Sequence, residues 1–262
     1  QMKKMSIKLI TSLLAGIFCL LPLSAVAQDA PPPLSEIWMV TPKAGHLEEF
    51  QAALKEHTDV RLEHGDPWAW QVYTSIVGDD LNQYAIRYCC ATWADLDSYA
   101  KWEEANPKVL GHWVETVAPH VEKIQHYFDQ IDWSNSHWSA DAGPFRYFAV
   151  TEWGIKGGHE ADFTSARKVM SQVAINQGWA TTGKNWIWST TIGGKTRNAI
   201  VIPHKNFADM APGEETFFEF LAKHMGSEEA AGDLLKKFSS AAWGSELTVW
   251  EHMPGLSMSE KE

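Results

Sequence analysis

Apolar side chains follow two alternating periods along this chain, one typical of strands and one typical of helices. Residues 37–41 form a short apolar, β-prone segment that ends at Pro42, which predicts a strand. Residues 45–64 predict a helix, because one face repeats at alternating steps of three and four: Leu47, Phe50, Leu54, His57, Arg61 and His64. Gly65 and the Asp-Pro that follows it predict the end of this helix.

The same analysis predicts the remaining elements. In the first half it indicates two strands, a helical region interrupted near Asn106-Pro107 and a closing strand, at residues 68–77, 83–91, 94–120 and 121–128. In the second half it indicates a strand, a helix, a hairpin, two helices and a last strand, at residues 147–151, 158–177, 186–192, 196–202, 214–225, 228–242 and 247–252.

Three short motifs recur in the same order in the two halves. The matched segments are 45–50 with 158–163, 70–78 with 186–194, and 85–96 with 199–210. Their offsets of 113, 116 and 114 residues change only where loops would differ in length. A near-constant offset predicts a tandem duplication.

Each half has the order β-α-β-β-α-β, which is the ferredoxin-like plan within the α+β class. Helices cover only one face of such a sheet, so the other face must be buried against something else. Two units in one chain satisfy this need when their sheets pack face to face. The predicted divisions are a signal peptide at 1–27, a first repeat at 28–131, a linker at 132–144, a second repeat at 145–256 and a polar tail at 257–262.

The start of the first repeat carries a family resemblance. A strand followed by Pro42, Gly45 and Phe50, and then a helix ending in Leu-Glu-His-Gly at 62–65, resembles the dimeric α+β barrel superfamily, in particular its NIPSNAP-like and antibiotic-monooxygenase-like branches. The resemblance covers nearly all of residues 36–254. It implies a ligand between the two sheets. Family members form the barrel from two chains, so the duplication implies a barrel within one chain.

The first residues have the pattern of an export signal. Lys3 and Lys4 precede an apolar run at 9–23, and Ala25-Val26-Ala27 provides a small-x-small cleavage site. The run is short for a membrane span, although an uncleaved anchor is the alternative. The sequence therefore predicts a periplasmic or secreted protein.

The net charge of −11 argues against two classes of partner. Removal of residues 1–27 takes three lysines and leaves 19 cationic against 33 acidic side chains, a charge of about −14. Nucleic acids and anionic lipid surfaces both require clustered cations, so neither is expected. A small apolar or aromatic molecule is the expected partner, and a homo-oligomer is compatible with the sequence.

Fourteen tryptophans provide the candidate ligand-binding side chains. Trp68 and Trp70 are two positions apart on one strand face, and Trp186 and Trp188 repeat this pair. Such residues either line an aromatic pocket or pack beneath the helices. The predicted pocket walls are Trp70, Tyr84, Trp186 and Trp188.

Polar side chains within apolar strands are the catalytic candidates. Arg87 lies between Ile86 and Tyr88, so it faces the interior if that apolar pair faces the helices. His126 and His252 occupy matching last strands, and His204 ends the preceding strand of the second half. A structural role is the alternative for all four. No histidine–carboxylate spacing indicates a metal site.

Cys89 and Cys90 are the only cysteines after residue 27. Because they are adjacent, they cannot close a loop that staples the fold. Two small buried residues are expected, with a vicinal disulfide or a reactive thiol as the alternative.

The leading hypothesis is an exported small-molecule-binding barrel. The resemblance implies a cofactor-independent monooxygenase or isomerase, in which a polar residue moves a proton. A haem enzyme of the chlorite-dismutase-like type is one alternative, and it would need His204 or His252 as the axial ligand. A non-catalytic binding or interaction protein is the other.

Overall fold

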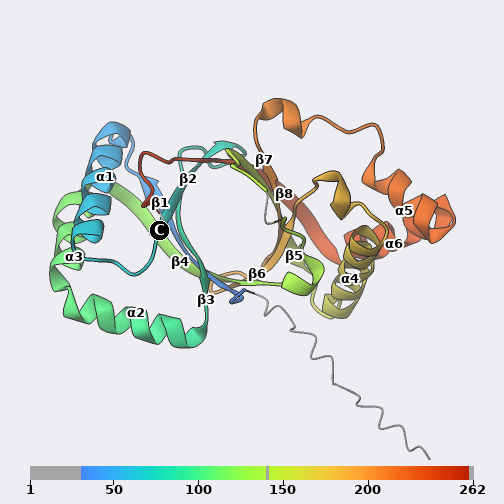
Figure 1. Cartoon of the computed structure of the whole chain (residues 1–262), viewed down its shortest axis with the longest axis horizontal. Helices are drawn as coiled ribbons and strands as arrows, with labels where there is room; N and C mark the ends of the chain where they lie inside the picture. Colours follow the sequence, from blue (N-terminus) through green and yellow to red (C-terminus); the bar gives the residue numbers. More distant parts are fainter. Residues whose placement is uncertain (1–30, 140–141, 260–262) are drawn as a thin grey trace, which may run out of the picture.

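In a computed structural model that describes residues 31–139 and 142–259, eight strands close into one antiparallel barrel (Figure 1). The strand order around the barrel is β1-β3-β2-β8-β5-β7-β6-β4. Each half therefore contributes a four-stranded sheet, in the order β4-β1-β3-β2 or β8-β5-β7-β6. This is the predicted α+β architecture of two ferredoxin-like units within one chain. The predicted signal peptide lies outside the described residues.

The observed elements follow the predicted order in both halves. The first half comprises β1 (Leu34–Pro42), α1 (Leu47–Glu63), β2 (Gln71–Val77), β3 (Tyr84–Ala91), α2 (Trp93–Ala105), α3 (Pro107–His112) and β4 (Val121–Ile131). The second half comprises β5 (Tyr147–Ile155), α4 (Glu160–Asn176), β6 (Ile187–Ile192), β7 (Asn198–His204), α5 (Phe217–Met225), α6 (Glu228–Ser240) and β8 (Ala242–His252).

Two strand pairings join the halves and remove the sheet edges. In β2 and β8, Tyr73 pairs with His252, and in β4 and β6, Asp129 pairs with Thr191. Closure satisfies the backbone groups that an open edge would leave unpaired. No helix in the described ranges is long and apolar enough to cross a membrane.

The predicted helical region at 94–120 is divided into several segments. Thr92 begins α2 with a capping box, in which its side chain accepts from the Asp95 backbone N–H. Asn106 ends this helix, and Pro107, which lacks a backbone N–H, begins α3. A π-helical turn and a 3-10 turn then lead into β4.

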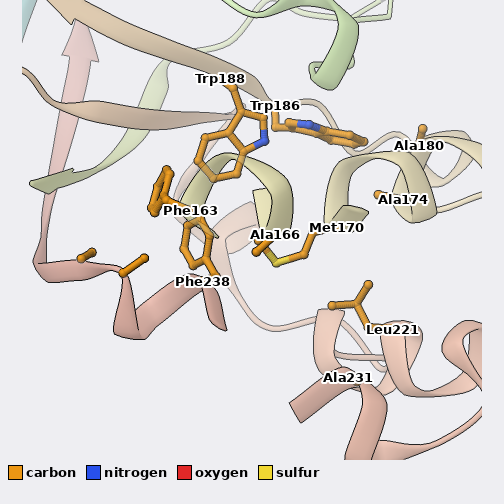
Figure 2. Packing of buried hydrophobic residues seen from close by; sticks show 12 residues of the cluster. Phe163, Ala166, Met170, Ala174, Ala180, Trp186, Trp188, Leu221, Ala231 and Phe238 are labelled. Carbon is orange, nitrogen blue, oxygen red and sulfur yellow. The ribbon is translucent and has the colours of Figure 1, made fainter. Parts of the chain in front are cut away.

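The hydrophobic cores lie outside the barrel, between each sheet and its helices. Helices α1–α3 cover one half and α4–α6 cover the other (Figure 1). In the second half, Trp188 of β6 packs with Phe163 of α4 and Phe238 of α6 (Figure 2). Each sheet therefore has one face against helices and one face towards the barrel interior.

The last described residues form a strap that crosses from the second half to the first. The Met253 N–H donates to the Val72 carbonyl at 2.8 Å, and the Met258 N–H donates to the Trp70 carbonyl at 2.8 Å. Leu256 and Met258 are buried in the two cores of the first half. Residues 257–259, predicted as part of a polar tail, are thus partly core. Strand β8 ends at His252, opposite Tyr73, so the strap takes the place of a strand along the part of β2 that precedes Tyr73.

Candidate ligand site in the barrel interior

Strand alternation separates the interior-facing residues from the core residues. Ile86 and Tyr88 of β3 pack against the first-half core, so Arg87 and Cys89 face the barrel interior. Tyr73 of β2 faces the interior too, because its ring contacts that of Phe148 from the other half edge-on, with the ring centroids 5.2 Å apart. The interior is therefore shared by side chains from both halves.

A cavity of about 480 Å³ opens where β2 and β3 meet the C-terminal strap. Its volume is within the range of small-molecule sites. Its walls combine residues of the interior face with residues of the first-half core: Gln71, Tyr73, Arg87 and Cys89 with Trp68, Tyr88 and Met258. Of the four polar candidates, only Arg87 lines this cavity.

Arg87 is partly buried, and its charge is not paired in a salt bridge with any described residue. Among the described residues, its guanidinium has no hydrogen bond and no ion pair. The charge of Arg87 interacts with the Asp129 carboxylate on β4 and favours its ionised form. A guanidinium offers up to five N–H donors in a planar fork that matches carboxylate oxygens. The cavity therefore presents an anion-binding group.

Asp129 of β4 is an interior residue that the sequence analysis missed. The register places Ser35 of β1 between Cys89 on one side and Asp129 on the other. The Ser189 hydroxyl donates to Asp129 Oδ2 at 3.2 Å. Burial raises the pKa of Asp129, while Thr191, Arg87 and Ser189 partly oppose the shift. A raised pKa makes the carboxylate of Asp129 a better proton acceptor than an ordinary aspartate.

Glu152 of β5 adds a second interior carboxyl group. Burial raises its pKa, and the negative charges of Asp129 and Glu246 add to the shift. Arg197 opposes it through an ion pair at 3.1 Å. Among the described residues, the interior thus combines the guanidinium of Arg87 with the carboxyl groups of Asp129 and Glu152, rather than with the predicted tryptophans.

His252 faces the interior but is held by neighbours. Its Nε2 lies 3.0 Å from Gln71 Oε1 and 3.2 Å from Ser257 Oγ. Burial lowers the pKa of His252, so the neutral imidazole is favoured. His252 therefore positions Gln71 in the cavity wall and does not itself line the cavity.

His126 and His204 lie on the outer faces of their sheets. His126 stacks on Trp38 with ring centroids 3.9 Å apart, and its Nε2 lies 2.8 Å from Glu36 Oε1. His204 lies on the same strand face as Ile200, which packs into the second-half core. The fold therefore does not bring the four polar candidates into one site.

The predicted aromatic walls are corrected by the structure. The indole N–H groups of Trp70, Trp186 and Trp188 donate to Tyr99, Asn135 and Ser171 outside the barrel interior. Tyr84 is buried against Phe50, in contact with α1. The prediction failed because alternation shows which residues share a face, but not which face points inward.

Cys89 and Cys90 form a disulfide, which corrects the expectation of two small buried residues. Cys89 lines the cavity. In the β1–β3 ladder, Ser35 pairs with Cys89 and Leu34 with Ala91, so Cys90 is the extra residue of a bulge.

The described residues do not fit a haem. No histidine is among the cavity walls, His252 is held by Gln71 and Ser257, and His204 lies on the outer face. An axial ligand would need a free imidazole nitrogen facing the open volume. In residues 31–139 and 142–259, no group of three or more histidine, cysteine or acidic side chains is arranged to hold a metal ion.

Comparisons with known proteins agree on the fold. No protein-family model and no curated protein match the sequence. Among solved structures, a candidate monooxygenase from Fusobacterium nucleatum is similar, with a TM-score of 0.51 and 11% identity over 88% of this chain and 99% of the other. A mutant chlorite dismutase from Candidatus Nitrospira defluvii has a TM-score of 0.50 and 9% identity over 87% and 94%. The chain has the dimeric α+β barrel fold.

Proposed function

We propose that this chain is an exported protein that binds a small organic anion inside the barrel and transfers a proton on it. The observation that carries the proposal is the unpaired guanidinium of Arg87 in the wall of the 480 Å³ cavity. A partly buried cation that makes no hydrogen bond or ion pair with the described residues is best satisfied by a negatively charged ligand.

The cavity also defines the size and polarity of the ligand. Tyr73 and Tyr88 provide aromatic wall, while Gln71 and Arg87 provide polar contacts. A compact aromatic or unsaturated molecule with one carboxylate, phenolate or enolate group suits these walls. This ligand is more polar than the apolar molecule that the sequence predicts, because none of the four predicted aromatic wall residues lines the cavity.

The supported reaction begins with proton abstraction. Asp129 accepts a proton from a carbon next to a carbonyl group, and the guanidinium of Arg87 stabilises the enolate that forms. In an isomerase, Asp129 returns the proton to a different carbon. A cofactor-independent monooxygenase begins with the same step and then consumes O₂. Asp129 faces the barrel interior and interacts electrostatically with Arg87, and this position supports the role.

Solvent-derived exchange tests the reaction. Ligands found by native mass spectrometry are incubated with the mature protein in D₂O and followed by NMR. We expect deuterium to enter next to the carbonyl group with the native protein and not with Asp129→Asn. Binding without exchange in the native protein would leave a binding protein and overturn the catalytic proposal. Oxygen consumption would select the monooxygenase over the isomerase.

The export proposal rests on the signal pattern at residues 1–27. The full chain is expressed in a Gram-negative host, and the periplasmic proteins are released by osmotic shock. The intact mass of the released protein should be that of a chain beginning at Gln28. A full-length mass in the membrane fraction would instead support the uncleaved anchor.

A further inference from the structure

The disulfide between Cys89 and Cys90 does not act as a staple of the fold. Disulfides stabilise a protein mainly by closing a loop of the unfolded chain, and adjacent residues close almost none. After residue 27 the sequence has no other cysteine with which this pair could rearrange. Opening the bond therefore costs the fold little, so the pair is free to serve chemistry.

The position of the pair supports such a use. Cys89 lines the cavity, and both cysteines are only partly buried. Cys90 is the bulged residue of the β1–β3 ladder, and bulges are enriched next to functional sites. A molecule in the cavity can thus reach the Cys89 sulfur.

Arg87 supplies charge at the same place. It is two positions from Cys89 on the same strand face and lines the same cavity. A nearby cation stabilises a thiolate, and a guanidinium binds a carboxylate in a defined orientation. The cavity therefore combines a disulfide with an anchor for an anionic thiol.

We propose that Cys89 and Cys90 form a thiol–disulfide exchange site for small thiols that carry a carboxylate group. The carboxylate binds Arg87, and the thiolate of the bound molecule attacks the Cys89 sulfur. A mixed disulfide forms at Cys89, and Cys90 leaves as a thiolate that takes a proton from water. A second small thiolate then attacks the sulfur of the bound molecule, so that two thiols become one disulfide and the protein pair becomes a dithiol.

This activity is separate from the proposed proton transfer, although both use Arg87 as an anion anchor. Asp129→Asn should abolish deuterium exchange and leave thiol exchange in place. Failure of one proposal is therefore distinguishable from failure of the other.

The test compares two small thiols on the mature protein purified without reductant. Mercaptoacetate carries a carboxylate and 2-mercaptoethanol does not. Thiol labelling and intact mass measure the rate at which each thiol opens the protein disulfide, at matched thiolate concentrations. Each rate is divided by the rate at which the same thiol opens a small neutral disulfide. We expect a normalised preference of about fivefold or more for mercaptoacetate. Equal normalised rates, or a pair that is not disulfide-bonded, would overturn the proposal.

Matched variants assign the roles. Arg87→Gln should remove the preference, and Arg87→Lys, which keeps the charge, should retain part of it. In Cys90→Ser, the remaining Cys89 thiol should capture the oxidised dimer of mercaptoacetate faster than Cys90 does in Cys89→Ser. The reverse order would place the reactive sulfur at Cys90 and contradict attack from the cavity.

Discussion

His252 Nε2 lies 3.0 Å from Gln71 Oε1, and this contact joins the end of β8 in the second half to the start of β2 in the first half. Gln71 Nε2 in turn donates to the Met258 carbonyl at 2.9 Å. The polar wall of the cavity thus depends on both halves of the chain and on the strap that links them.

The strap should contribute to stability out of proportion to its length. Met258 is only 3% exposed in the first-half core, so Met258→Ala should lower the free energy of unfolding by about 2–4 kcal/mol. The matched control is Leu247→Ala in β8, because Leu247 is 53% exposed and its truncation should change the free energy by about 0.5 kcal/mol or less. Urea unfolding measures both. An equal effect of the two substitutions would show that the strap is not anchored in the core.

Trp188 should matter for stability and not for ligand binding. Its indole packs between β6 and the helices (Figure 2). The indole N–H donates to Ser171 Oγ at 3.0 Å. Trp188→Phe should therefore lower the free energy of unfolding by about 1–3 kcal/mol, because it removes area and leaves a buried hydroxyl without this donor. The dissociation constant of a lumen ligand should change less than about twofold. A loss of affinity comparable to that of Arg87→Gln would show that Trp188 contributes to ligand binding.

Stability should fall as the solution is acidified, in part because of His57. Burial lowers the pKa of His57 to about 3 from 6.5, with the charge of Arg61 adding to the shift. Between pH 6.5 and 3 the unfolded chain binds a proton at this residue that the folded chain does not. The free energy of unfolding therefore decreases as pH falls through this window, by at most about 1.4 kcal/mol per pH unit from this group.

The measurement is urea unfolding of the native protein and His57→Gln at pH 6, 5 and 4. The variant should lose stability less steeply on acidification, whatever its stability at neutral pH. The exposed His46 provides the control, because His46→Gln should keep the native slope. Parallel curves for the native protein and His57→Gln would contradict a buried neutral imidazole.

Most elements could be predicted because local patterns determine them. The helix at 45–64 matches α1, and the Asn106-Pro107 interruption matches the boundary between α2 and α3. The last strand begins five residues earlier than predicted, at Ala242. Residues 243–246 carry no strand pattern, and their extended form comes from pairing with β5, which is a long-range effect.

The candidate site could be predicted only in part. The alternation of Ile86, Arg87 and Tyr88 indicated that Arg87 is set apart from the core residues. It could not show that the Trp pairs face the helices, because that choice is made by packing across the whole sheet. Asp129 was missed since the predicted strand ended at residue 128, one position before it, whereas β4 continues to Ile131 through its pairing with β6.

The central claim is that Arg87 binds an organic anion in the barrel interior. The most direct measurement is calorimetric titration of a carboxylate ligand and its neutral amide analogue into the native protein, Arg87→Gln and Arg87→Lys. The account predicts that the native protein prefers the carboxylate by at least about tenfold, that Arg87→Gln loses this preference and that Arg87→Lys keeps part of it. Equal affinity of the native protein for carboxylate and amide, or an unchanged preference in Arg87→Gln, would contradict it.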